Sequence, residues 1–198
     1  ILPGSEPAWS TDYDLYAVPV EGPRAMRCLT EDNEAWDTEP VFSPDGTTLA
    51  YIAMARPGYE ADRFQIMRSD WPSGENKYSL TRRWDRSPGS FVFSPDSQRI
   101  YASATNLGQH SIFAIGAKNG RDVEIMHDGW AGTPKFAGDR LIFGMDHLHS
   151  PVEIYSMTEG GADLKQITKI NEAKLAAARM GDAEQFNFKG WNDEKVYG

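Results

Sequence analysis

The chain has 198 residues, of which 40% are apolar and 25% are charged, a composition typical of a globular protein that can bury a sizeable core. Its formal charge of −9 makes nucleic acid a poor partner. Its longest apolar run, Leu49–Ala55, is too short to span a bilayer, and its single cysteine, Cys28, excludes an internal disulfide.

The first expected elements lie in residues 12–30, where "DLYAV" and "RCLT" are strand-like and are separated by Pro and Gly. The chain starts with "ILPGSEPAW", without an initiator Met or a charged-then-apolar leader. We therefore expect it to be an internal piece of a longer protein.

Next along the chain, "VFSPDGTTLAYIA" begins at Val41 and a close copy, "VFSPDSQRIYASA", begins at Val92. "SPDG" predicts a type I turn, because Pro presets φ for the second position and Gly closes the turn. The flanking segments are rich in strand formers, so each copy predicts a tight antiparallel hairpin. A third copy, "KFAGDRLIF", keeps the turn, loses the Pro and is one residue shorter. The expected first strands cover residues 39–43, 90–94 and 133–137.

Apolar markers recur through the whole region, at spacings of 51, 46 and 42 residues for the set Leu15, Ile66, Ile112 and Ile154. A period of about 40–50 residues with four short strands is typical of a propeller blade. The predicted fold is therefore all-β: a half blade at about 12–30, then blades at about 36–81, 85–126 and 130–168. Closed propellers have about four to eight blades, so we expect this region (1–170), with about three and a half blades, to be part of a larger propeller.

The repeat stops after Thr168. The segment Asn171–Met180 predicts a short helix capped by Asn171. The following "EQFNFKGWNDEKVYG" predicts a hairpin that turns at Asn192 and Asp193. Residues 171–198 are thus expected to be a linker helix and the first hairpin of a second domain.

Four stretches carry a family resemblance: "AWDTEPVFSPDG", "RPGYEADR", "WDRSPGSFVFSPD" and the exit "FNFKGWNDEKVYG". They resemble the prolyl oligopeptidase family of serine peptidases, in its dipeptidyl-peptidase V and acylaminoacyl-peptidase branch, and most closely its secreted fungal members. The resemblance covers nearly the whole chain. "SPDG" alone is shared with unrelated propellers, including those similar to TolB, whereas "GYEADR" followed by "WDRS" is more specific.

The resemblance implies a seven-bladed propeller joined to a C-terminal α/β-hydrolase domain that holds the Ser-Asp-His residues. No G-x-S-x-G motif occurs in this sequence, so the chain alone is expected to lack peptidase activity. The implied partners are a peptide substrate, the remaining blades and the hydrolase domain. The resemblance also implies secretion, and nothing in the sequence calls for a cofactor.

Candidate binding residues lie in two loops. The loop "ARPGYEADRF" contains Glu60, Asp62 and Arg63, and a carboxylate here, first of all that of Glu60, could hold the free ammonium group of a peptide. Alternatively, Glu60 and Asp62 pair with Arg56 and Arg63 to order the loop. In "WDRS", we expect Arg86 to face the propeller channel, while a structural role for this turn, with Asp85 bonded to the blade backbone, is the alternative.

Other polar clusters have simpler interpretations. His147 and His149 have the alternation that puts two imidazoles on one strand face, but no Cys or third His is nearby, so a loop is expected here and not a metal site. The acidic stretch 31–39 is expected to be a solvated connection, because it lacks the pattern of a calcium loop. Cys28 is either a small buried apolar residue or bonded to a missing part. The tryptophans that recur between the repeats, Trp36, Trp84 and Trp130, are expected to pack between blades.

Two other functions compete with an accessory peptidase domain. A stand-alone propeller scaffold for protein binding would continue with another repeat after Thr168, which this sequence does not. A propeller glycosidase would need inward carboxylates on successive inner strands, and "VFS" and "KFA" offer none.

Overall fold

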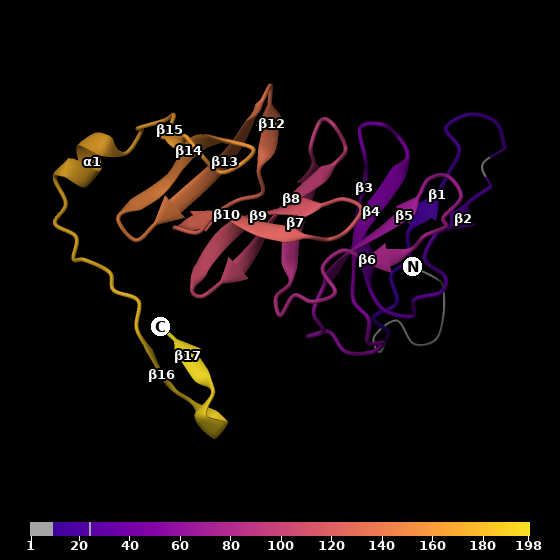
Figure 1. The fold of residues 1–198 in the computed structure, drawn as a ribbon, viewed down its shortest axis with the longest axis horizontal. Coiled ribbons are helices and arrows are strands. Elements are labelled where there is room, and N and C mark those ends of the chain that lie inside the picture. Colours follow the sequence, from indigo (N-terminus) through magenta and orange to yellow (C-terminus); the bar gives the residue numbers. More distant parts are fainter. Residues whose placement is uncertain (1–9, 24) are drawn as a thin grey trace. The chain divides into compact units, whose positions relative to one another are not determined.

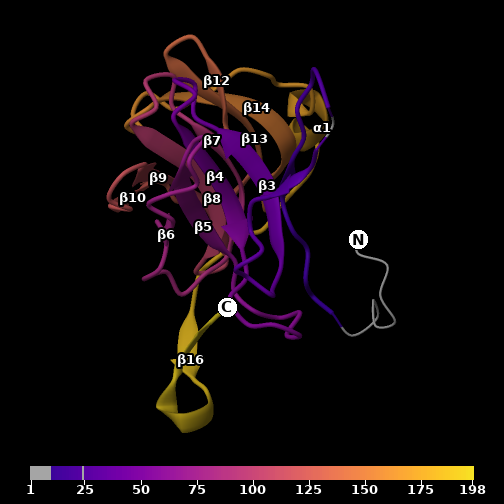
Figure 2. The same ribbon diagram turned by 90° about the vertical axis from the view of Figure 1, so that its right-hand side faces the viewer.

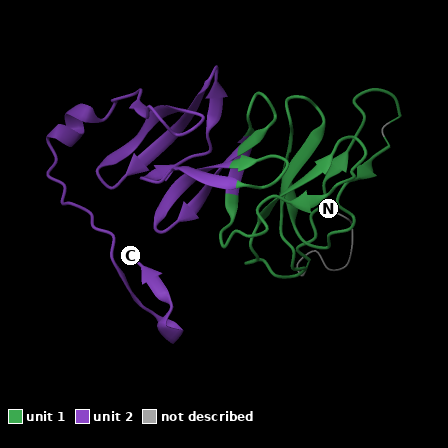
Figure 3. Cartoon of the chain, in the orientation of Figure 1, with its two compact units in different colours: residues 1–88, 93–100, 115–121 green, residues 89–92, 101–114, 122–198 purple. Residues whose placement is uncertain are grey.

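The computed structural model describes residues 10–23 and 25–198. They fall into two compact units, of which unit 1 comprises residues 1–88, 93–100 and 115–121 and unit 2 comprises residues 89–92, 101–114 and 122–198 (Figure 3). Within the described ranges, no helix combines the length and the apolar character that a membrane span requires.

Unit 1 contains two antiparallel sheets (Figures 1 and 2). The first pairs β1 (Tyr16–Ala17) with β2 (Arg27–Cys28). The second is a four-stranded meander in the order β3-β4-β5-β6. Its strands are β3 (Asp37–Phe42), β4 (Thr48–Ala53), β5 (Gln65–Asp70) and β6 (Tyr78–Ser79).

Most of the remaining strands lie in unit 2 and join one sheet in the order β15-β14-β13-β11-β9-β8-β7, with β10 on β9 and β12 on β13. The strands are β7 (Pro88–Phe93), β8 (Arg99–Asn106), β9 (Gln109–Gly116), β10 (Asp122–Met126), β11 (Trp130–Ala131), β12 (Lys135–Ala137), β13 (Arg140–His147), β14 (Ser150–Thr158) and β15 (Lys165–Gln166). The all-β prediction is confirmed, and β3, β7 and β12 lie where the first strands of the repeats were expected.

The predicted turn after β3 is present. The Gly46 N–H donates to the Ser43 carbonyl at 2.9 Å, and the Ser43 hydroxyl donates to the Asp45 carboxylate at 2.6 Å. The second copy repeats this arrangement, with Ser97 in the position of the glycine at φ 61°. Ser97 tolerates the left-handed conformation and also accepts the Asp45 N–H at 3.1 Å, so it links the two turns.

The third turn is shorter than expected. Phe42 pairs with Leu49 in the first hairpin, whereas Phe136 pairs with Leu141 in the third, which removes two residues and not one. Without the Ser-Pro-Asp segment, Gly138 at φ 62° makes the reversal with Asp139 alone.

The "LT" that ends several repeats has a role that the sequence did not reveal. The threonine hydroxyl accepts the N–H of the apolar marker on the neighbouring strand, and the residue before the threonine donates its own N–H to the carbonyl of that marker. The threonine–marker pairs are Thr30–Leu15 at 3.0 Å, Thr81–Ile66 at 2.9 Å and Thr168–Ile154 at 2.8 Å. The hydroxyl therefore continues the strand pairing by one bond beyond the backbone.

We expect Thr81→Val to lower the free energy of unfolding by about 1–2 kcal/mol, because it leaves the Ile66 N–H without its acceptor at a buried position. Urea denaturation of the chain measures this. Thr105→Val is the control, since Thr105 lies exposed on β8. Equal changes for the two variants would contradict a role for the hydroxyl bond.

The turn of one repeat closely approaches the outer strand of the repeat before it. In unit 1, a Cβ on Gly120 would lie 2.2 Å from the Leu80 carbonyl oxygen, and in unit 2 a Cβ on Gly161 would lie 2.2 Å from the carbonyl oxygen of Ile125. Only glycine fits at this distance. At the corresponding place earlier in unit 1, the Lys77 ammonium donates to the Leu29 carbonyl at 3.2 Å.

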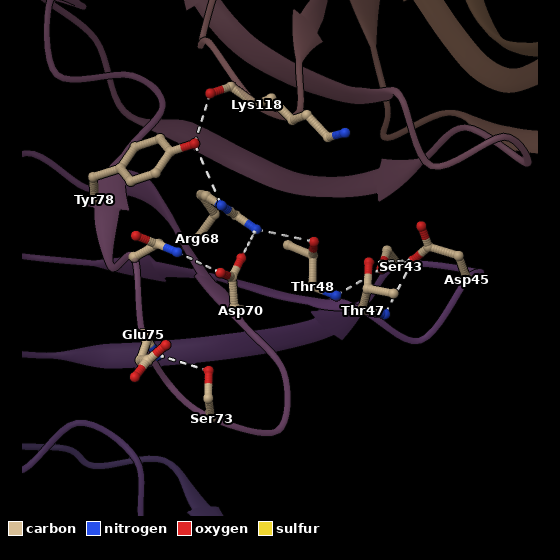
Figure 4. A network of polar contacts seen from close by, with 11 residues as sticks. Ser43, Asp45, Thr47, Thr48, Arg68, Asp70, Ser73, Glu75, Tyr78 and Lys118 are labelled. Carbon is tan, nitrogen blue, oxygen red and sulfur yellow. Dashed lines mark hydrogen bonds and ion pairs between the residues drawn. The ribbon is translucent and has the colours of Figure 1, made fainter.

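A buried arginine holds the outer part of the β3–β6 sheet together. Arg68 is 8% exposed, and it donates to the Thr48 hydroxyl at 3.1 Å and to the Asp70 carboxylate at 2.6 Å (Figure 4). It also reaches the Tyr78 hydroxyl at 3.4 Å, which in turn donates to the Lys118 carbonyl at 2.6 Å. A buried charge needs such partners, so this network accounts for an arginine in a strand interior.

The segment after β15 contains the predicted short helix and hairpin. These are α1 (Glu172–Ala176), β16 (Asn187–Lys189), the 3-10 turn η1 (Trp191–Asp193) and β17 (Lys195–Tyr197). Asn192 and Asp193 have φ 53° and 60°, as a two-residue hairpin turn requires. The predicted side-chain cap by Asn171 is wrong, because its amide donates to the Glu153 carboxylate at 3.1 Å. The assignment of residues 171–198 to a second domain stays a prediction.

Candidate functional site

The candidate loop "ARPGYEADRF" connects β4 to β5, and Asp62 organises it. The Asp62 carboxylate accepts the N–H groups of Ala55 at 2.8 Å and Arg56 at 2.9 Å. Partial burial raises the pKa of Asp62, but the N–H groups of Ala55, Arg63 and Arg56 lower it by more, so its pKa lies below the ordinary value. Asp62 is therefore engaged by its own loop.

The basic residues of the loop have partners other than the expected carboxylates. The Arg56 guanidinium lies 4.0 Å from the centre of the Tyr59 ring, and Arg63 donates to the Thr81 carbonyl at 3.2 Å. Glu60 is exposed, and within the described part of the chain it forms no ion pair with Arg56 or Arg63. The alternative prediction, in which Glu60 and Asp62 form ion pairs with the two arginines of this loop, is therefore wrong for the described residues.

The second candidate turn holds a local ion pair. The Arg86 guanidinium lies 2.8 Å from the Asp85 carboxylate, and its hydrogen bond and charge lower the pKa of Asp85. The Asp85 side chain is 82% exposed. This turn contacts the end of the β4–β5 loop, because the Phe64 N–H donates to the Ser87 hydroxyl at 3.1 Å. The charge of Arg63 in that loop also lowers the pKa of Asp85.

A cavity of about 720 Å³, which the sequence did not predict, lies over one face of the β3–β6 sheet in unit 1. Strand pairing places Tyr51, Met67 and Ser79 in one row of this face. Asp37 and Gln65 both lie beside Ala53 on the same face. The β4–β5 loop borders the cavity through Ala55 and Arg63, and the segment after β2 contributes Asp32 and Asn33.

A β-bulge puts Asp37 on this face. Asp37 pairs with Ala53 and Phe42 pairs with Leu49, so β3 has one residue more than β4 between the two pairs. The extra residue is accommodated at Glu39, whose φ is 51°. Without the bulge, the alternation of the strand would direct Asp37 to the opposite face from Phe42.

The Asp37 carboxyl group is buried and incompletely bonded. The residue is 3% exposed, Oδ2 accepts the Asn33 amide at 2.9 Å, and Oδ1 has no hydrogen-bond partner among the described residues. Burial raises its pKa to about 7, although the Asn33 bond acts in the opposite direction. Burial and the neighbouring carboxylate of Asp37 also raise the pKa of the Tyr51 hydroxyl.

The sequence predicted that the whole acidic stretch 31–39 would be exposed to solvent. In the structure only part of it is exposed. Glu31, Glu34 and Glu39 are exposed, and Asp32 forms an ion pair with Lys77. Asp37 departs from the expectation. The only sequence signal for this is its place at the first position of a strand, directly after Trp36.

The histidine pair does not lie on one strand face. His147 ends β13 and His149 lies in the following turn, where its Nε2 bonds to the Gly181 carbonyl at 2.8 Å. Across the described residues, no group of three or more His, Cys, Asp or Glu side chains could hold a metal ion. Cys28 is half-buried and is not in a disulfide.

The tryptophans are only partly used for packing. The Trp36 ring stacks on Tyr13 at 4.9 Å, and Trp84 is 9% exposed. Trp130 is 54% exposed and stacks on His110 at 4.7 Å. It also lines a second cavity of about 440 Å³ in unit 2.

Comparison with known proteins matches the chain to part of the length of several named peptidases. No protein-family model matches the chain. The probable dipeptidyl-peptidase 5 of Arthroderma benhamiae is 30% identical over 140 residues, which are 65% of this chain and 19% of that protein. Dipeptidyl-peptidase 5 of Trichophyton schoenleinii matches to the same extent. The match thus spans about a fifth of the length of these relatives.

Solved structures show the same fold. The acylaminoacyl peptidase of Pyrococcus horikoshii matches 94% of this chain with 28% of its own, at a TM-score of 0.72 and 16% identity. The β-propeller domain of the Trilobed protease from Pyrococcus furiosus matches 85% of this chain with 49% of its own, at a TM-score of 0.65 and 14% identity. The sequence match to dipeptidyl-peptidase 5 and the shared fold together support the predicted resemblance to a propeller part of the prolyl oligopeptidase family.

Proposed function

We propose that the chain is the non-catalytic propeller portion of a secreted serine exopeptidase of the dipeptidyl- or acylaminoacyl-peptidase type. In that enzyme it restricts peptide access to the hydrolase domain and helps to position the N-terminus of the substrate. The observation that carries this proposal is the 30% identity to proteins named dipeptidyl-peptidase 5, in a chain whose fold matches peptidase propellers.

The β4–β5 loop supports the positioning role. Asp62 is held by backbone N–H groups and Arg63 by carbonyl groups, which leaves Glu60 as the exposed carboxylate of the loop. An exopeptidase that requires a free N-terminus needs a carboxylate to bind the ammonium group. Glu60 is thus the residue of this loop that we assign to that contact, and Arg86 is a further candidate for binding the peptide.

We expect Glu60→Gln in the complete enzyme to lower kcat/KM about tenfold to a hundredfold on dipeptidyl substrates with a free N-terminus, because it removes a charged hydrogen bond while keeping the shape. Substrates with a blocked N-terminus should be cleaved almost as before. Steady-state kinetics on both substrate types measure the difference.

The control variant is Glu75→Gln, which changes an exposed glutamate in the β5–β6 connection. It should leave both activities unchanged. Equal losses on free and blocked substrates in Glu60→Gln would reject the ammonium contact and leave Glu60 with a structural role.

A further inference from the structure

The cavity over the β3–β6 sheet contains polar atoms that lack partners. Asp37 Oδ1 and Ser79 Oγ are buried without a hydrogen bond to any described residue, and both residues line the cavity. Buried polar groups are satisfied in the great majority of native structures, because leaving one unbonded costs about 1–3 kcal/mol. Both atoms can bond to a ligand that brings its own donors.

The charges around the cavity indicate which sign that ligand carries. Among the described residues, three cations line the cavity. Lys77 is engaged by the Asp32 carboxylate and the Leu29 carbonyl. Arg63 is engaged by the Thr81 carbonyl, and Arg82 is exposed to solvent. Asp37 is the buried ionisable residue of the cavity that has only a neutral partner, the Asn33 amide. An ionised Asp37 therefore favours a cation with N–H donors.

The rest of the lining is suited to an apolar group. Tyr51 is 3% exposed and Met54 is 5% exposed, and Met67 is half-buried beside them. Aromatic and thioether side chains adapt well to small organic ligands. The volume of about 720 Å³ lies within the range of small-molecule sites.

We propose that this cavity binds a small primary amine, whose ammonium group is held by the Asp37 carboxylate and whose apolar body packs against Tyr51, Met54 and Met67. This site is separate from the peptidase role proposed above and does not depend on it. It requires only the 198-residue chain, since every residue named belongs to unit 1.

The first test titrates the chain at pH 8 with 2-phenylethylammonium and with 2-phenylethanol, in which a neutral hydroxyl group replaces the ammonium. For a ligand of this size we expect a Kd on the order of 1 mM for the amine. The alcohol should bind at least about tenfold more weakly. Equal affinity of the two compounds, or no saturation by the amine at about 20 mM, would overturn the proposal.

The second test assigns the contact to Asp37. Asp37→Asn should weaken amine binding at least about tenfold, whereas Asp128→Asn, the same change at an exposed position outside the cavity, should not alter it. Circular dichroism establishes that each variant is folded.

A measurement on the unaltered chain does not depend on the folding of a variant. Binding of the amine near pH 6.5 should release a proton, because it favours the ionised form of Asp37. Calorimetry in two buffers of different ionisation enthalpy detects this release. Amine binding without proton release would exclude Asp37 as the anchor.

Discussion

Gly161→Ala is expected to lower the melting temperature of the chain by about 6–12 °C or to prevent folding. The new Cβ would lie 2.2 Å from the Ile125 carbonyl oxygen and 3.0 Å from the Ile125 carbonyl carbon, and Gly161 has φ 82°. The left-handed conformation alone costs alanine about 1 kcal/mol. Displacing a neighbouring strand adds about 2 kcal/mol or more, and a chain of this size loses about 2–4 °C for each kcal/mol.

Gly108→Ala separates the two effects. Gly108 also has φ 82° and also lies in unit 2, but a Cβ there would meet nothing within 4 Å. We expect this variant to melt only about 2–4 °C lower. If differential scanning calorimetry gave the same shift for both variants, the close approach to Ile125 would not contribute to stability.

The second large effect concerns Asp37 and pH. The unfolded carboxyl has its ordinary pKa of 3.8, and the folded one has a pKa of about 7. Between these values the folded state binds more protons than the unfolded state, so this group destabilises the fold increasingly as pH rises from about 4 to about 7. Asp37→Asn removes the titration. Its stability relative to the unaltered chain should therefore increase by about 2 kcal/mol between pH 5 and pH 8.

Several charged or titratable groups face Asp37 and contribute to this value. The Asn33 amide and the Lys77 ammonium lower the pKa of Asp37, whereas burial and the carboxylates of Asp14 and Asp32 raise it. The Tyr51 hydroxyl stays protonated over this range, because its own pKa is raised. Urea denaturation at both pH values measures the effect. The control is Asp128→Asn, which keeps Asp37, so its stability relative to the unaltered chain should be the same at both pH values.

The hairpins could be predicted from the sequence because their information is local. Ser43, Asp45 and Gly46 bond to one another within four residues, and Asn192 and Asp193 form a turn that depends on their own φ angles. The apolar markers are similarly reliable, since a residue such as Ile66 is buried in every plausible packing of its strand. Local chemistry was thus sufficient for the strands and most turns.

The candidate site was harder to predict, because it depends on a register shift and on distant partners. The bulge at Glu39 reverses the face on which Asp37 lies. The segment "WDTEP" contains no residue, such as a glycine, from which the bulge could be predicted. The alternative interpretation of the β4–β5 loop paired Arg63 with an acid of that loop, but Arg63 donates to the carbonyl of Thr81, which is 18 residues away along the chain. The turn at Gly138 was correctly predicted to be shorter than the other two, but it is shorter by two residues and not by one.

The contact between successive repeats has a consequence for how such chains evolve. Gly120 lies against main-chain atoms of Leu80, and Gly161 lies against the carbonyl group and the Cβ of Ile125. Every residue except glycine carries these atoms, so neither contact requires a particular side chain on the preceding outer strand. A gene segment that encodes one repeat can therefore be duplicated, deleted or recombined with another, and its product still meets a compatible neighbour. The outer strands that carry Leu29, Leu80 and Ile125 are then free to diverge, as "RCLT", "YSLT" and "VEIM" have done.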